Sequence, residues 1–302
     1  MPGDWIIAGA FGSELITCLE KIGLDGKDIR MIANLYWHQK AAIKIQNELS
    51  PFTSIQRGVR QGCVLSPCLF NLYTEFIFRE SNHLPGINIH GQNLNNIRYA
   101  DDTALLADSE EKLQNIVSCV KTESSRAGLD MNIKKTKTMI ISRNPAGKKV
   151  NIEVDGQYLE QIEKMKYLGT LITEEIKTDL ELDTRSNLAK TKFSEMSKIL
   201  TSKRLKLKTK LKILNCYIFS IFTYGSEAWT LSKVLENKIE ATEMWCLRRL
   251  SNILWKDKVS NEEVLRRLGT KRTLLDKIKK RKCRYYGHIK RKNNVLTMAV
   301  EG

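Results

Sequence analysis

Apolar residues recur at two different spacings in the first half of the chain, and the change of spacing predicts helices followed by short strands. Leu15, Leu19 and Ile22 share one face at helical spacing, and residues 29–36 repeat it. Apolar and polar residues then alternate one by one over 43–46, as they do in a short strand. The pattern therefore predicts two amphipathic helices and then extended chain.

Start and stop signals predict two more helices in this half. Ser66 and Pro67 are favoured residues at the N-cap and the first helical position, and they predict a helix over 66–79. Ser109 is expected to cap the next helix. That helix should end before Gly128, because glycine readily takes the left-handed conformation that follows a helix.

Strand signals lie between and after these helices. Residues 97–107 contain two apolar runs separated by Asp101 and Asp102, and this arrangement predicts a β-hairpin. Residues 137–142 and 166–172 are further strand candidates.

The second half has only helical spacing. Its apolar residues recur at three- and four-residue intervals in four stretches, 183–200, 207–221, 233–254 and 273–286. Residues 260–263 form a capping box. All five prolines lie in the first half, which suits long helices in the second. We therefore expect an α+β fold class, with an antiparallel sheet and helices up to about residue 175 and an all-helical region beyond it.

The positive charge of the chain is concentrated in that helical half. The 302 residues contain 50 lysines and arginines and 34 acids, for a net charge of +16. Residues 151–302 hold 32 of the basic and 19 of the acidic side chains, so they account for +13. Solvated helix faces can also be rich in lysine, but 13 basic residues against one acid over 266–292 favour contact with phosphates.

Cysteine usage and hydropathy exclude other classes of protein. Seven scattered cysteines are an odd number, and the first residues resemble no signal peptide. We therefore expect free thiols and an intracellular, reducing location in the nucleus or the cytoplasm. No apolar run approaches the roughly 18 residues of a membrane helix, so no membrane partner is expected.

Asp101 and Asp102 are the main candidates for chemistry. Aspartate is a common turn residue, so an isolated Asp-Asp turn has an ordinary structural explanation. Two adjacent carboxylates also repel each other, and a divalent cation relieves that repulsion. Two such cations could hold the attacking and leaving oxygens of a phosphoryl transfer.

A segment before this turn has residues that could bind a phosphate-containing ligand. Within residues 57–70, Gly58 and Gly62 allow the backbone to approach a ligand closely. Arg57, Arg60 and Gln61 supply donors for phosphate and amide contacts. Taken alone, this stretch could equally be an ordinary connection between a strand and a helix.

Two later segments complete the set. Residues 128–137 include Asn132, Lys135, Thr136 and Lys137, and Tyr167-Leu168-Gly169 follows. In this order the segments resemble the reverse transcriptase domain of non-LTR (LINE-type) retrotransposons. The resemblance extends from about residue 14 to about residue 292, and the coincidence of an Arg-Gln-Gly…Ser-Pro string with a Tyr-Ala-Asp-Asp turn is highly specific.

The resemblance implies a role for each motif. Asp101 and Asp102 would be metal ligands in the turn that begins at Tyr99, and Lys135 would be the general acid that protonates the leaving pyrophosphate. Template and incoming nucleotide would be held by a set of loop residues, Arg57, Arg60, Gln61, Gly62, Ser66, Pro67 and Tyr99. The primer grip would be Tyr167, Leu168 and Gly169.

The same resemblance implies the ligands. They are an RNA template, a DNA primer and the RNA–DNA duplex between them, deoxynucleoside triphosphates, and two Mg²⁺ or Mn²⁺ ions. It also implies a palm with a remnant of the fingers over 1–175, which would carry motifs B to E. A helical, basic thumb and C-terminal region would follow over 176–302.

The family pattern has a third carboxylate that this sequence does not match. Transferring the usual spacing from Gln61 places it near Ala8, and the nearest acid is Asp4. We expect weak or no polymerase activity from an N-terminally truncated domain, and Trp5 to Ala8 could fill the vacant strand position. The alternative is a nucleic-acid-binding remnant without enzymatic activity.

Overall fold

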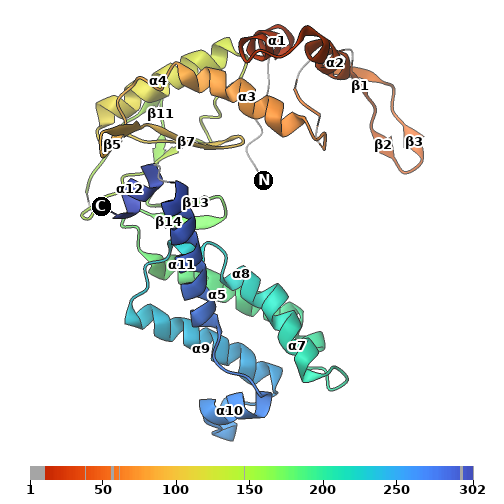
Figure 1. Ribbon diagram of the computed structural model, residues 1–302, viewed down its shortest axis with the longest axis vertical. Coiled ribbons are helices and arrows are strands. Elements are labelled where there is room, and N and C mark those ends of the chain that lie inside the picture. The colour runs from red at the N-terminus through yellow and green to blue at the C-terminus, as the bar shows by residue number, and fades with distance from the viewer. Residues whose placement is uncertain are drawn as a thin grey trace. The chain divides into compact units, whose positions relative to one another are not determined.

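Two groups of elements, each with its own apolar core, make up the chain. The computed structural model describes residues 11–37, 39–55, 58–60, 62–145, 147–292 and 295–301 (Figure 1). The first unit comprises 1–138 and 149–162, and the second comprises 139–148 and 163–302. The expected strand at Trp5 to Ala8 lies outside the described residues.

Four helices form the framework of the first unit. They are α1 (Phe11–Lys21), α2 (Gly26–Tyr36), α3 (Ser66–Arg79) and α4 (Glu110–Arg126). Leu69 and Tyr73 of α3 pack with Ile116 of α4 and Leu15 of α1 in one buried cluster. Since a buried leucine or isoleucine side chain contributes about 1.5–3 kcal/mol, this cluster is the main stabilising contact of the unit.

The helix ends follow local signals with one exception. The Ser109 side chain accepts a hydrogen bond from the Lys112 amide at 3.3 Å, and Gly128 has a φ of 68°, so both predicted ends of α4 are confirmed. Ser66 is not the N-cap of α3, because Leu65 occupies that position. The Ser66 hydroxyl instead donates to the Arg60 carbonyl at 2.6 Å, closing the preceding loop.

The strands of the first unit are short and occur in pairs. They are β1 (Gln39–Ala41), β2 (Lys44–Ile45), β3 (Glu48–Leu49), β4 (Thr53–Ile55), β5 (Ile87–Ile89), β6 (Gln92–Leu94), β7 (Asn96–Tyr99), β8 (Asp102–Leu105), β9 (Lys137–Thr138), β10 (Glu153–Val154), β11 (Gln157–Tyr158) and β12 (Glu160–Gln161). The antiparallel pairs are β1–β4, β2–β3, β5–β6, β7–β8 and β10–β11, and β9 pairs with β12 in parallel.

The hairpin predicted over 97–107 is therefore confirmed. Among the described residues, no third strand pairs with β7 or β8. The strand predicted over 137–142 extends only over β9.

Eight helices and one hairpin build the second unit in its described part. The hairpin is β13 (Lys164–Tyr167) and β14 (Thr170–Thr173), so the single strand predicted over 166–172 is wrong. The reason is a two-residue turn at Leu168 and Gly169, which reverses the chain. The helices are α5 (Thr178–Glu195), α6 (Ser197–Leu200), α7 (Leu207–Ile213), α8 (Ser220–Phe222), α9 (Lys233–Leu250), α10 (Asn261–Leu268), α11 (Leu274–Lys292) and α12 (Val295–Glu301).

Short irregular helices join some of these elements. A π-helical segment, η1 (Leu214–Phe219), connects α7 to α8, and two 3₁₀ turns occur at η2 (Ser226–Ala228) and η3 (Trp255–Asp257). The helix predicted over 207–221 thus has a widened turn in its middle. The Ser260 side chain accepts a hydrogen bond from the Glu263 amide at 3.2 Å, so the predicted cap of α10 is confirmed.

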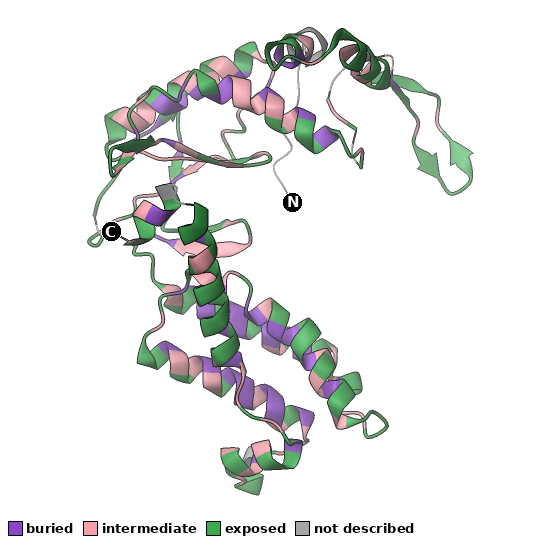
Figure 2. Cartoon of the chain, viewed as in Figure 1, coloured by how far each residue is buried: buried purple, intermediate pink, exposed green. Residues whose placement is uncertain are grey.

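The core of the second unit lies between α5, α9 and the segment from α7 to α8. Buried positions recur among exposed ones along α9 (Figure 2), and the same holds along α5. Leu182 and Phe193 of α5 pack with Ile239 and Leu247 of α9 in this core. The expected class of mixed helices and strands is confirmed.

The cysteines and the hydropathy of the helices were also considered in the sequence. All seven cysteines are free thiols. None of the described helices combines the length and the apolar character that crossing a bilayer requires.

Candidate functional site

The Asp-Asp pair lies at the tip of the β7–β8 hairpin. Tyr99 pairs with Asp102 in the ladder, so Ala100 and Asp101 form the two-residue turn. Ala100 has a φ of 53°, a left-handed conformation that costs a non-glycine residue about 1–2 kcal/mol. Strained backbone of this kind often occurs at functional sites. The Asp102 side chain is exposed and Asp101 is half-buried, so the tip presents carboxylate oxygens at the surface.

A single Mg²⁺ ion would fit this tip. Mg²⁺ is commonly held by one or two carboxylates together with the phosphates of a substrate. Asp101 and Asp102 would supply those carboxylates. In the part of the chain that the structure describes, no three acidic, histidine or cysteine side chains come together as a metal site. The residues at hand therefore do not fit a two-ion site with three carboxylates, and Asp4 and Ala8 lie outside the described residues.

Contacts of Arg98 fix the hairpin to α3. The Arg98 guanidinium lies 2.6 Å from the Glu75 carboxylate and 4.8 Å from the centre of the Phe78 ring. Leu105, at the end of β8, packs against the apolar cores on both sides of α4. The hairpin tip is thereby held in a defined relation to α3, which follows the loop that contains Gly58 and Gly62. We call this loop the Gly-rich loop.

The Gly-rich loop is closed by hydrogen bonds around Ser66. Arg60 and Ser66 are joined at 2.6 Å, and the Tyr36 hydroxyl lies 3.0 Å from the Ser66 hydroxyl. Gly62 has a φ of 84°, which favours glycine, and Pro67 lies in the first turn of α3. The Arg60 side chain is exposed and available to a ligand. Arg57 and Gln61 lie outside the described residues.

Tyr36 also changes the chemistry of the loop. Its hydroxyl donates to the Cys63 sulfur at 3.3 Å. This hydrogen bond, assisted by the Leu65 amide, lowers the pKa of the Cys63 thiol to about 7. The sequence did not predict that Tyr36 and Cys63 belong to this site, because they are 27 residues apart and no local pattern indicates their contact.

Residues 132–136, which include Lys135, form a turn around Asn132. Its side-chain oxygen accepts a hydrogen bond from the Lys135 amide at 3.1 Å, and its carbonyl accepts from the Thr136 amide at 2.9 Å. The Lys137 ammonium lies 2.5 Å from the Glu160 carboxylate. Lys135 is exposed, so its ammonium group can reach a ligand while Lys137 is engaged with its partner strand.

The predicted primer grip lies in the second unit, apart in sequence from the Asp-Asp hairpin. Leu168 and Gly169 have φ values of 47° and 81° and connect β13 to β14. Two residues with positive φ are typical of a tight hairpin turn, but leucine is a costly choice for the first of them. The turn is held by Arg185 and Tyr224, neither of which sequence reasoning assigned to the site.

The second unit contains two sets of basic side chains that sequence could not separate, one paired with carboxylates and one not. Several cations of α10, of α11 and of the loop between them are paired with carboxylates, in the pairs Arg266–Glu263, Arg267–Glu263, Arg272–Glu240, Lys279–Glu236 and Arg281–Glu227. Within the other set, we call the exposed cations of residues 198–212 the 198–212 basic segment; they are Lys198, Lys203, Arg204, Lys206, Lys208 and Lys212.

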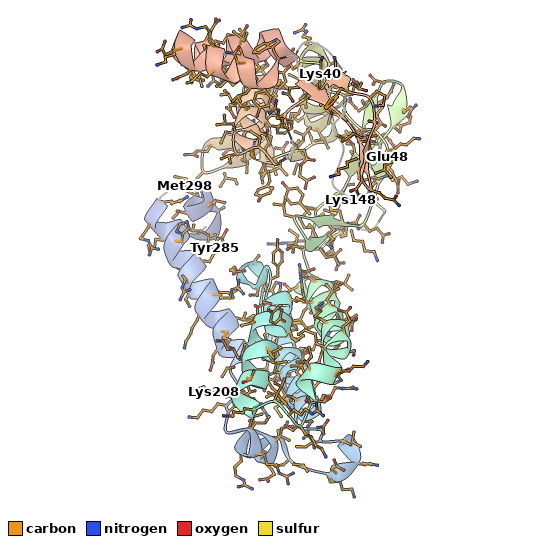
Figure 3. All side chains as sticks on the ribbon, turned by 90° about the vertical axis from the view of Figure 1, so that its right-hand side faces the viewer. Lys40, Glu48, Lys148, Lys208, Tyr285 and Met298 are labelled. Carbon is orange, nitrogen blue, oxygen red and sulfur yellow. The ribbon has the colours of Figure 1, made fainter. Side chains whose placement is uncertain are left out.

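The two groups differ in how much charge they offer a ligand. Residues 198–212 contain no acid. In the described chain, no member of the 198–212 basic segment forms an ion pair, and Lys208 projects outward from α7 (Figure 3). The segment therefore offers a polyanion positive charge that no carboxylate compensates. Exposed cations of α11 such as Lys280 and Arg284 likewise form no ion pair in the described chain.

Comparison with known proteins agrees with the motifs. The family model described as reverse transcriptase (RNA-dependent DNA polymerase) matches residues 13–172. A transposon-derived protein of Caenorhabditis elegans is 27% identical over 215 residues, which are 69% of this chain and 76% of that protein.

Polymerases of mobile elements are also similar. The RNA-directed DNA polymerase from the mobile element jockey of Drosophila melanogaster is 23% identical over 221 residues, 70% of this chain and 24% of that protein. The Pol polyprotein of the type-1 retrotransposable element R2 of Nasonia vitripennis is 28% identical over 146 residues, 45% of this chain and 14% of that protein. The chain thus spans a quarter or less of these two polypeptides. Since the family model covers more than half of the chain, this protein belongs to the reverse transcriptase family, and its relatives include non-LTR retrotransposon polymerases.

Proposed function

We propose that this chain is the template- and primer-binding polymerase segment of a non-LTR retrotransposon reverse transcriptase. The observation that carries the proposal is the Asp101–Asp102 tip, on a hairpin that Arg98 fixes to the helix after the Gly-rich loop. In a chain of this family, that arrangement suits a site where a primer, a nucleotide and a metal meet. RNA template, DNA primer and deoxynucleoside triphosphates are its proposed ligands.

Each part of the first unit has a proposed role. Arg57, Arg60 and Gln61 would contact the template and the incoming nucleotide through guanidinium and amide donors. Gly62 would allow close approach of the backbone, and the Ser66 hydroxyl would keep the loop closed through its hydrogen bond to Arg60. Pro67, in the first turn of α3, and Tyr99, beside the Asp-Asp turn, would also contact the template or the nucleotide.

Asp101, Asp102 and Lys135 are the proposed reactive groups. A Mg²⁺ ion bound at the two carboxylates would neutralise charge that develops on the phosphates during nucleotide transfer. The Lys135 ammonium, exposed and anchored through its backbone to Asn132, would donate a proton to pyrophosphate. Without a third carboxylate at the position of Ala8, we expect catalysis to be weak, since losing one positioned electrostatic group typically raises the barrier by about 3 kcal/mol.

We assign residues 1–175 to the palm with a remnant of the fingers, and residues 176–302 to the thumb and C-terminal region. This boundary stays a prediction, and residues 163–175 belong to the second compact unit. The 198–212 basic segment is the proposed surface for phosphates of the duplex, because its charges have no carboxylate partner in the described chain.

Primer extension on an RNA template tests the proposal. The full chain is incubated with a primer–template, deoxynucleotides and Mg²⁺ or Mn²⁺, and binding is measured in parallel by fluorescence anisotropy. Salt-dependent binding together with weak extension supports the proposal. Binding without any extension in either metal supports a remnant that only binds nucleic acid, and absence of binding contradicts both.

A further inference from the structure

The turn at Leu168 and Gly169 is strained, and its surroundings hold it in place. Both residues have positive φ, and Leu168 keeps a side chain that is 38% exposed. A leucine in this conformation persists only where neighbouring contacts determine the backbone. The residues that make those contacts come from distant parts of the chain.

Two hydrogen bonds reach the backbone carbonyls of the turn. The Tyr224 hydroxyl donates to the Leu168 carbonyl at 2.8 Å, across 56 residues of sequence. The Arg185 guanidinium donates to the Gly169 carbonyl. Because both bonds end on the main chain, they fix the direction of the two turn peptides whatever side chain the turn carries.

A buried ion pair supports these bonds. Arg185 also donates to the Glu181 carboxylate at 2.6 Å, and the two side chains are 9% and 4% exposed. The second oxygen of Glu181 accepts a hydrogen bond from the Leu171 amide at 2.9 Å, at the start of β14. The carboxylate therefore joins the guanidinium and the hairpin backbone, and it satisfies the buried charge from both sides.

The aromatic ring of Tyr224 closes the arrangement. The centre of this ring lies 4.7 Å from the Arg185 guanidinium carbon, which is over its face. A Cβ atom on Gly169 would be 3.4 Å from the Tyr224 ring, and one on Gly225 would be 2.9 Å from the Thr170 hydroxyl oxygen. Residues 224–225 are thus seated directly against the hairpin, with no room for a larger side chain at Gly225.

We propose that Glu181, Arg185 and Tyr224 are positioning residues that hold the Leu168–Gly169 turn in the shape that receives the primer 3′ end. This inference rests on the proposed function, because it takes the turn as the primer contact. It also gives the Tyr224-Gly225 pair a role. Tyr224 bonds the turn, and Gly225, with a φ of 70°, lets the chain lie close to Thr170. The three residues touch the turn and not the reacting atoms.

Tyr224→Phe tests this with little disturbance, because it removes only the hydroxyl and keeps the ring. Tyr217→Phe is the matched control, since Tyr217 lies on η1 and is 56% exposed. Hydrogen exchange of the full chain is followed over residues 165–172. One hydrogen bond corresponds to about a five-fold change in an equilibrium, so exchange in the turn should rise about five-fold in Tyr224→Phe only.

The second readout is the preference for a recessed primer end. Affinity is measured for a DNA primer on a longer RNA template and for the same sequence as a blunt duplex. Tyr224→Phe should lower the ratio of the two affinities about five-fold and leave blunt-duplex affinity within two-fold of the parent chain. Arg185→Lys should act in the same direction, because lysine keeps the charge but cannot bond both partners in the same geometry.

Each result has a defined meaning. Faster exchange in the turn together with loss of the preference supports the inference. Unchanged exchange in Tyr224→Phe overturns it, and so does faster exchange with an unchanged preference. A parent chain that binds duplexes without preferring a recessed end overturns the inference alone, whereas a chain that binds no nucleic acid contradicts the proposed function as well.

Discussion

Neutralising the 198–212 basic segment should weaken nucleic-acid binding in a way that depends on salt. The perturbation is a fourfold variant in which Lys203, Arg204, Lys206 and Lys208 become glutamine. These four are exposed and, in the described chain, form no ion pair, so each can release one counterion when it meets a phosphate. Their loss removes contacts without leaving any carboxylate unpaired.

The expected magnitude follows from counterion release. Each phosphate contact contributes about 0.9 to the slope of log affinity against log salt concentration, so four contacts contribute about 3.6. Between 50 and 200 mM salt, the parent chain should then lose roughly a hundred-fold more affinity than the variant. Fluorescence anisotropy of a labelled RNA–DNA duplex across this salt range measures both slopes.

A matched variant separates the position of the charges from their number. Changing Arg266, Arg267, Arg272 and Lys279 to glutamine removes four charges from α10, α11 and the loop between them, and each of these charges is paired with a carboxylate. We expect its slope to change by less than about one, because those charges are already compensated. Equal slopes for the two variants would refute the reasoning, as would a fourfold variant that binds with the parent slope.

Other predictions concern stability and reactivity. Glu243→Ala should destabilise the second unit by about 2–3 kcal/mol in thermal unfolding, because Glu243 is buried and caps α11 through two amides, whereas Glu240→Ala on the same helix should cost less than about 1 kcal/mol. Gly225→Ala should cost about 1–3 kcal/mol in the same assay, and an unchanged midpoint would contradict the packing against the hairpin. The Cys63 thiol has a pKa of about 7, so its alkylation rate should level off by pH 8, while ordinary thiols keep accelerating. Removing the hydrogen bond in Tyr36→Phe should raise that pKa and move the plateau to higher pH; identical pH profiles would show that the bond has no such effect.

Local signals in the sequence predicted local structure well. The β7–β8 hairpin, the Ser109 cap and the capping box at Ser260 each depend on residues within a few positions of one another, and all are confirmed. The prediction of Ser66 as the helix cap was wrong, because its hydroxyl instead donates a hydrogen bond to the Arg60 carbonyl in the loop. A serine side chain can bond either partner, and no sequence rule ranks the loop contact above a helix cap.

Contacts between distant segments were not predictable in the same way. Glu181 and Arg185 look like an ordinary exposed pair on a helix, since their spacing of four residues is common on polar faces. They are buried because the turn at Gly169 and the ring of Tyr224 cover them. The division of basic residues into paired and unpaired groups depends in the same way on acids of α9, such as Glu236, that lie beside α11.

The motifs shared with the reverse transcriptase family were the most informative part of the sequence. Asp101 and Asp102 could be placed on a hairpin tip from their neighbours alone, and the structure places them there. The left-handed conformation of Ala100 was not foreseen, because alanine has no preference for it. How the tip is fixed to α3 through Arg98 also required the structure, since Glu75 lies 23 residues away.

Primer extension with the full chain and its Asp101→Asn variant tests the central claim most directly. The claim is that this member of the reverse transcriptase family binds primer–template and supplies two carboxylates of an incomplete catalytic set. The account predicts salt-sensitive binding by both proteins and weak extension by the parent chain in Mg²⁺ or Mn²⁺ that the variant loses. Robust extension by the parent chain that disappears in Asp101→Asn would contradict it, because two carboxylates would then be enough.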